Sequence, residues 1–99
     1  MTYRGRGFLM PAQVYGDIWP DAAGARSEDS IPEYARYARH IAIRLSDAMS
    51  AEDLTLRDVQ ARCGVDHGTV SKILKGTTLP DVVTLSRLET GLGVTLWPG

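Results

Sequence analysis

The sequence predicts an all-α fold, with four to five helices packed into one compact domain. Apolar residues recur at spacings of three and four in several segments, which is the pattern of a helix with one buried face. Polar residues that can accept hydrogen bonds from free backbone N–H groups precede these segments, and glycines follow two of them. The chain has 99 residues and a hydrophobic fraction of 43%, which suits a single folded domain.

The first long helix is expected to begin near residue 30. Ser30 and Glu33 have the spacing of a capping box, in which each side chain bonds the backbone N–H of the other residue. Pro32 suits the first turn, because its missing N–H would have no partner there. The predicted buried stripe consists of Tyr34, Ala38, Ile41, Leu45 and Met49. The arginines off this stripe, which we expect to face solvent, are Arg36, Arg39 and Arg44.

A second, short helix is predicted over the stretch "TLRDVQARCG". Thr55 and Asp58 form another capping-box pair, with Asp in place of the usual Glu. Gly64 provides the stop, since glycine adopts the left-handed conformation that ends many helices. Cys63, directly before this glycine, is expected to be a small core residue.

Two further helices are predicted downstream. Asp66 is placed to cap a third helix from His67 to Lys75, which Gly76 ends. Asp81 is the expected cap of a fourth helix that runs to about residue 92. The apolar stripe predicted for this fourth helix consists of Val82, Leu85, Leu88 and Leu92.

Both ends of the chain interrupt helical periodicity. Residues 1–29 contain glycines and prolines that break long helices, and we interpret them as an extended arm and a polar connector. This segment has more aromatic residues than a plain linker: Tyr3, Phe8, Tyr15 and Trp19. We therefore expect the arm to pack on its own domain or on a partner. The short tail after residue 92 is expected to be extended, with Trp97 packed back onto the helices.

Two short helices joined by a tight turn at Gly64 have the arrangement of a helix-turn-helix. In this motif the first helix crosses the DNA backbone and the second enters the major groove. The stretch from His67 to Pro80 contains Lys72 and Lys75 but no acidic residue, as a helix beside phosphates requires. The formal net charge of −1 argues against a strongly basic, non-specific nucleic-acid binder but does not exclude a local basic patch. Residues 30–99 are thus the predicted DNA-binding domain.

The stretches "LTLRDVQARCGVDHGTVSKILKG" and "LPDVVTLSRLETGLGV" together resemble a known family. They are similar to the helix-turn-helix domain of phage repressors and Cro proteins, often called the XRE family. The resemblance runs from about Ile31 to Val94 and implies a lambda-repressor-like fold. The residues at the family's core, turn and fourth-helix positions are Val59, Gly64, Val65, Val70, Ile73, Gly76 and Pro80.

The resemblance also implies which residues contact DNA. By position in the family, the base contacts fall on His67, Gly68, Thr69 and Lys72, with Ser71 beside them. The expected phosphate contacts are Thr55, Arg57, Lys75 and Thr77. Arg4 and Arg6 either form an arm that enters a minor groove or only keep the N-terminus soluble. Two residues depart from the family: Gln60 replaces a usual alanine, and Gly68 has no side chain with which to contact a base.

The predicted function is sequence-specific binding of double-stranded DNA to regulate transcription, as a phage repressor, a Cro-like switch or a small bacterial regulator. A homodimer is expected on DNA, with the arm or the tail around Trp97 at the contact. The alternative is an antitoxin that binds a toxin through the aromatic arm and regulates its own synthesis through the helix-turn-helix.

Other classes of function have little support in the sequence. Cys63 and His67 are half of a metal site at most, because the chain has one cysteine and two histidines. We expect no metal, no cofactor and no enzymatic activity, since a small helical domain has little room for a catalytic pocket. No apolar run approaches the length of a membrane span, and the N-terminus lacks a signal-peptide core. The expected location is the cytoplasm, which also suits a single free thiol.

Overall fold

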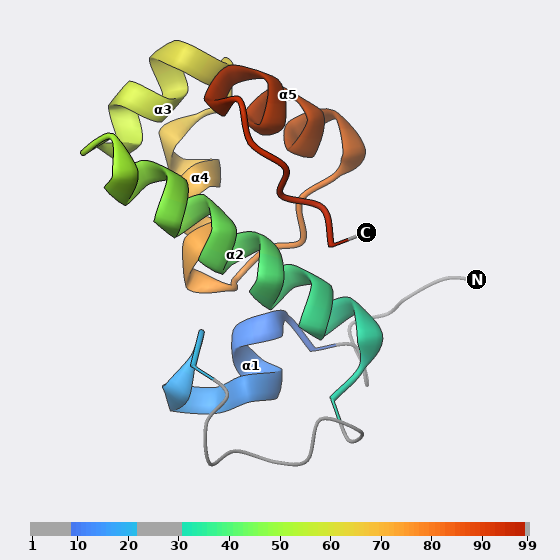
Figure 1. The fold of residues 1–99 in the computed structure, drawn as a ribbon. Helices are drawn as coiled ribbons and strands as arrows, with labels where there is room; N and C mark the ends of the chain where they lie inside the picture. Colours follow the sequence, from blue (N-terminus) through green and yellow to red (C-terminus); the bar gives the residue numbers. More distant parts are fainter. Residues whose placement is uncertain (1–8, 22–30, 99) are drawn as a thin grey trace.

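The computed structural model describes residues 9–21 and 31–98. Within these ranges the chain forms helices and loops and no strand, which confirms the all-α class. The elements in order are α1 (Pro11–Tyr15), the short 3₁₀ helix η1 (Gly16–Ile18), α2 (Glu33–Ala51), α3 (Leu56–Cys63), α4 (His67–Lys75) and α5 (Val82–Leu92) (Figure 1).

Helix α2 is the long central element. Figure 1 shows α3, α4 and α5 packed around its C-terminal half and α1 beside its N-terminal half. Its buried residues are Ala35, Ala38, Ile41, Ala42 and Leu45. The predicted stripe is therefore corrected at its ends, where Tyr34 and Met49 are only partly buried. The small side chains of Ala35 and Ala42 face inward instead, because they allow neighbouring elements to approach closely.

The start of α2 also differs from the prediction. Pro32 is the N-cap residue rather than a member of the first turn, and no side chain caps the helix there. The backbone carbonyl of Pro32 accepts hydrogen bonds from the N–H groups of Ala35 and Arg36, at 3.0 and 3.2 Å. Ser30, the predicted cap, lies outside the described residues.

The main core is formed by the four helices α2, α3, α4 and α5 together with the C-terminal tail. Its fully buried side chains include Leu45, Val59, Val70, Leu88 and Leu96. Burying apolar surface of this kind is the main source of stability in a small domain. Helices α3 and α5 lie close together at Gly91, where an added Cβ would lie 2.6 Å from the Cys63 sulfur. The glycine is thus required by packing, and Cys63 is buried as expected.

The apolar face of α5 is narrower than predicted. Leu85, Leu88 and Leu92 are buried, but Val82 is 81% exposed. The carboxylate of Asp81 accepts from the N–H of Thr84 at 2.7 Å, so the helix starts at Val82 as predicted. The first turn borders an open groove beside Trp97 rather than the core, which leaves the Val82 side chain largely uncovered.

The N-terminal segment is helical where the sequence predicted an extended arm. Pro11 occupies the first helical position, and the Gln13 side chain accepts from the Met10 N–H at 2.8 Å. These local contacts start α1, and Gly16 ends it. A second, smaller core consists of Val14, Tyr15, Ile31 and Ala35, with Trp19 and Tyr34 packed against it. The arm therefore packs on its own domain, as one of the two expected possibilities.

The C-terminal tail is held by hydrogen bonds between its backbone and side chains of α2 and α5. The Oε2 atom of Glu89 accepts from the N–H groups of Leu96 and Trp97, at 2.7 and 2.9 Å. The Arg44 side chain donates to the Thr95 carbonyl at 3.1 Å. Trp97 contacts Tyr37 edge-on, with ring centroids 5.2 Å apart, yet it remains 49% exposed. The sequence reasoning singled out Trp97 and missed Leu96, which is the tail residue in the core.

Candidate nucleic-acid interface

Helix α3 begins and ends through contacts encoded within a few residues. The Thr55 hydroxyl accepts from the Asp58 N–H at 3.1 Å, and the Asp58 carboxylate accepts from the Thr55 N–H at 2.9 Å. This hydrogen bond from the Thr55 backbone lowers the pKa of Asp58. Gly64 ends the helix in the left-handed conformation, with φ of 72°. The predicted capping box and stop are both present.

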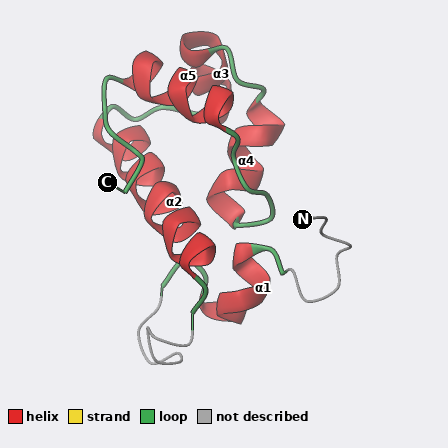
Figure 2. Ribbon diagram, turned by 90° about the vertical axis from the view of Figure 1, so that its right-hand side faces the viewer, coloured by secondary structure: helices red, strands yellow, loops and turns green. Residues whose placement is uncertain are grey.

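Three residues separate the end of α3 from the start of α4. The Asp66 carboxylate accepts from the Gly68 N–H at 2.9 Å, and Gly76 ends the helix with φ of 71°. Val59 of α3 and Val70 of α4 are both fully buried in the core between the helices. In Figure 2 a short loop joins α3 to α4, which lies at the edge of the molecule. Packing on one side therefore leaves the opposite side of α4 open.

The open face of α4 has hydroxyl and basic side chains and no acid. Val70 and Ile73 face the core, so helical periodicity turns Gly68, Ser71, Lys72 and Lys75 outward. Lys72 and Lys75 are exposed; the partly exposed residues of this helix include His67, Gly68, Thr69 and Ser71. The predicted base-contact residues are thus all accessible to a ligand, on or beside one face.

The cations of this region are available for a partner. Within residues 9–21 and 31–98, neither Lys72, Lys75 nor Arg57 forms an ion pair. Arg62, at the end of α3, is instead occupied by Glu52, whose two carboxylate oxygens each lie 3.1 Å from a guanidinium nitrogen. An unpaired surface cation keeps its attraction for phosphate, whereas a paired one has lost much of it.

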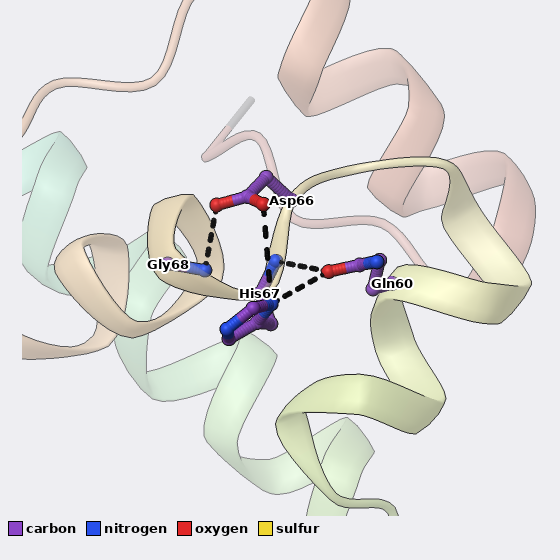
Figure 3. A network of polar contacts seen from close by, with 4 residues as sticks. All are labelled: Gln60, Asp66, His67 and Gly68. Atoms are coloured by element: carbon purple, nitrogen blue, oxygen red, sulfur yellow. Dashed lines mark hydrogen bonds and ion pairs between the residues drawn. The ribbon is translucent and has the colours of Figure 1, made fainter.

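Gln60 has a role that the sequence reasoning missed (Figure 3). Its side-chain oxygen Oε1 accepts from the His67 backbone N–H at 2.8 Å and lies 2.7 Å from the His67 ring nitrogen Nδ1. The same nitrogen is 3.9 Å from Oδ1 of Asp66. The larger side chain at the family's alanine position therefore ties α3 to the first residue of α4. The signals in the sequence are the departure from the family's alanine and a polar residue seven positions before a helix start.

Gly68 belongs to the same network. An added Cβ would lie 2.8 Å from Oδ2 of Asp66, the oxygen that caps the helix. The absence of a side chain thus leaves room for the capping carboxylate. As a further result, only backbone atoms can face a base edge at this position.

The residues expected to contact phosphates differ in whether their side chains already donate hydrogen bonds within the protein. Thr55 uses its hydroxyl oxygen as an acceptor, so its hydroxyl hydrogen remains available to a phosphate. Arg57 and Lys75 are exposed. The Thr77 hydroxyl instead donates to the Lys72 carbonyl at 3.4 Å, and its N–H donates to the same oxygen at 3.0 Å. Thr77 therefore closes the end of α4. Arg4 and Arg6 lie outside the described residues.

The N-terminal segment supports the end of α4. The indole Nε1 of Trp19 donates to the Leu74 carbonyl at 2.8 Å, and the Ala12 N–H donates to the Gly76 carbonyl at the same distance. The ring of Trp19 occupies the space beside Gly76, where an added Cβ would lie 2.5 Å from the indole. Two carbonyls at the end of α4 thus accept hydrogen bonds from a segment that the sequence predicted to be an extended arm.

Cys63, the one thiol of the chain, is buried. Burial raises the pKa of the Cys63 thiol, which keeps it protonated and unreactive near neutral pH. Residues 9–21 and 31–98 contain no group of three or more metal-ligating side chains. No described helix is both long enough and apolar enough to cross a membrane.

These features define a helix-turn-helix, with one helix braced against the core and a second that presents an acid-free basic face. A helix-turn-helix family model matches residues 45–96, more than half of the 99-residue chain. The protein therefore belongs to the XRE family of Cro- and repressor-type domains, which bind DNA in gene regulation. The comparison with curated proteins found no match.

Proposed function

We propose that the protein is a sequence-specific regulator of transcription that binds an operator in double-stranded DNA through α4, in the cytoplasm. A phage repressor, a Cro-like switch and a small bacterial regulator all share this mechanism. The observation that carries the proposal is the outer face of α4, where Lys72 and Lys75 are exposed, unpaired among the described residues and free of neighbouring acids on the same helix. Such a face is attracted to the major groove by its phosphates.

The proposed DNA contacts fall into two groups, contacts with base edges and contacts with phosphates. His67, Thr69, Ser71 and Lys72 occupy the first part of α4, which in this motif meets base edges, and Gly68 lets the backbone approach. Lys75 lies at the helix end, and Thr55 and Arg57 lie at the start of α3. In this motif the first helix crosses the DNA backbone, and Lys75 lies beyond the part of α4 that meets base edges, so these three residues are the proposed phosphate contacts.

We further propose that two protomers bind one operator. Half-sites are about 34 Å apart, and the protomer measures 36 × 32 × 24 Å, so adjacent protomers would come into contact. The first turn of α5 and the tail offer an apolar surface for this contact, because Val82, Val83 and Trp97 are 81%, 57% and 49% exposed. Trp19 is already bonded within the protomer, which favours the tail over the arm as the contact.

Selection of binding sites from random duplexes tests the function, and sedimentation on the selected site tests the assembly. A single enriched motif with two-fold symmetry and two protomers bound is the expected result. Enrichment of no motif would contradict sequence-specific binding. One protomer on an asymmetric site would contradict the dimer. A Val82→Asp variant, altered on the exposed surface only, should retain the fold and lose the second protomer.

An antitoxin that binds a toxin through the aromatic arm is the second candidate. It receives less support, because Tyr15 is buried and Trp19 is bonded to α4 within the same chain. A toxin gene beside the gene for this protein, and co-purification of the two products, would favour the antitoxin over the repressor.

A further inference from the structure

We propose that Gln60 holds His67 in the tautomer with its proton on Nδ1, so that the outward nitrogen Nε2 accepts a hydrogen bond from the amino group of adenine or cytosine. This inference rests on the proposed function, because it names the base chemistry that α4 recognises. Gln60 is a positioning residue in this scheme, and His67 is the residue that contacts the base.

The hydrogen-bond geometry determines which atom of the Gln60 amide faces His67. A backbone N–H is always a donor, so the side-chain atom 2.8 Å from the His67 nitrogen must be the acceptor oxygen Oε1. The same Oε1 atom lies 2.7 Å from Nδ1 of the ring. An oxygen that only accepts requires a donor opposite it, so Nδ1 must carry a hydrogen.

The charged neighbour of the ring acts in the same direction. Oδ1 of Asp66 is 3.9 Å from Nδ1, and a carboxylate also favours a hydrogen on the nitrogen that it faces. Asp66 belongs to the cap of α4, and Gln60 is the uncharged group that α3 contributes (Figure 3). Both neighbours therefore select the same tautomer.

A hydrogen on Nδ1 determines whether the other ring nitrogen of His67, Nε2, is a donor or an acceptor. A neutral imidazole has one N–H, so a hydrogen on Nδ1 leaves Nε2 with a lone pair and no hydrogen. Figure 3 shows Nε2 on the side of the ring away from Gln60. The His67 side chain is 38% exposed, and no described residue forms a hydrogen bond with Nε2. The first residue of α4 thus presents an unused acceptor.

The base edges in the major groove present both hydrogen-bond donors and hydrogen-bond acceptors to Nε2. Adenine N6 and cytosine N4 are donors, whereas guanine N7 and O6 and thymine O4 are acceptors. An acceptor at Nε2 pairs with the amino groups and faces lone pairs on guanine or thymine. The geometry therefore predicts adenine or cytosine on the strand that His67 contacts, and it predicts that the loss of Gln60 weakens this preference.

Nitrogen-15 NMR of the imidazole rings tests the tautomer without DNA. At a pH of about 8, above the ordinary range of histidine titration, the His67 signals should be those of a ring protonated on Nδ1. His40→Gln, a change on the exposed side of α2, assigns the two histidines. Gln60→Leu should shift the His67 signals toward a free imidazole, and Gln60→Glu, which keeps an acceptor, should not. A ring protonated on Nε2 in the unaltered protein would overturn the proposal.

DNA with single atoms deleted tests the base. On the selected operator, replacing the contacted adenine by purine, or the cytosine by its analogue without the 4-amino group, should weaken binding roughly fivefold to tenfold. In His67→Ala the same replacement should have no effect. If removal of N7 from a contacted purine is what weakens binding through His67, Nε2 is a donor and the proposal fails. A protein that binds no duplex overturns the proposed function and this base assignment, while the NMR result still decides the tautomer.

Discussion

The indole nitrogen of Trp19 donates a hydrogen bond to the backbone carbonyl of Leu74, 55 residues further along the chain, at 2.8 Å. The bond fixes the last turn of α4 to the N-terminal segment. Helix ends leave carbonyls without internal partners, and here a side chain from a distant element supplies one. The N-terminal segment is therefore part of the domain.

Trp19→Phe should lower the free energy of unfolding by at least about 1 kcal/mol, because one hydrogen bond is lost and the smaller ring no longer fills all of the space beside Gly76. Denaturant unfolding measures the change. Trp97→Phe is the matched control, since the Trp97 ring is half-exposed and its contact with Tyr37 is an edge contact that phenylalanine can retain. Equal effects of the two substitutions would contradict a specific role for the Trp19 bond.

Ile73→Ala should destabilise the protein by about 2–5 kcal/mol, because Ile73 is 2% exposed and its removal leaves a cavity in the core. Thermal unfolding should show a large drop in melting temperature. Val82→Ala, which also shortens an apolar side chain, should change the stability by less than about 0.5 kcal/mol at its exposed position. An unchanged melting curve for Ile73→Ala would mean that α4 has a different inward face.

Lys72→Ala and Lys75→Ala should weaken DNA binding in different ways. Lys72 lies one turn into α4, where a base edge such as guanine O6 and N7 is within reach, so its loss should cost about 1–3 kcal/mol on the operator and relax one base pair. Lys75→Ala should weaken binding to all sequences alike and reduce the salt dependence by about one charge.

Fluorescence anisotropy on matched and scrambled duplexes, at several salt concentrations, separates the two effects. Arg87→Ala, on the exposed surface of α5, serves as a control for a change in net charge. If Lys72→Ala leaves the discrimination between duplexes intact, the assignment of Lys72 to a base contact is wrong.

Asp66→Asn should strengthen DNA binding. The asparagine oxygen can keep the cap on the Gly68 N–H, so the helix start remains intact. The substitution removes the negative charge beside the proposed DNA-binding face, which should raise the affinity roughly twofold to fivefold at low salt and less at high salt. The melting temperature should change little. Weaker binding at every salt concentration would show that the carboxylate itself supports the bound state.

The stability should fall in acid partly through Glu89. Hydrogen bonds from the Trp97 and Leu96 N–H groups lower the pKa of this carboxyl in the folded state, from an ordinary value of 4.5. A group with a lowered folded pKa contributes stability above its unfolded pKa, and that contribution is lost as the pH falls through the folded pKa.

Glu89→Gln should therefore make the decline in stability below a pH of about 4.5 less steep. Unfolding by denaturant, repeated from neutral pH downward, gives the two slopes. Asp53→Asn, at an exposed carboxylate in the turn after α2, provides the comparison. Identical slopes for Glu89→Gln and the unaltered protein would mean that the tail contact does not persist in solution.

Much of the candidate site was predictable because its determinants are local. The box of Thr55 and Asp58, the cap at Asp66 and the left-handed glycines 64 and 76 each act within a few residues. The periodicity of Val70 and Ile73 defines the inward face of α4, and therefore also its outward face. These local signals predict the helix-turn-helix and the set of α4 side chains that we propose to face DNA.

The tertiary structure alone decided the rest, because those features depend on how separate elements pack together. Nothing near Trp19 indicates that it bonds the last turn of a helix 55 residues away, and only the packing of α3 against α4 brings Gln60 to the ring of His67. The exposure of Val82 likewise depends on which elements stand opposite the first turn of α5. Local periodicity determines which residues share a face of a helix, but packing decides which part of that face is covered.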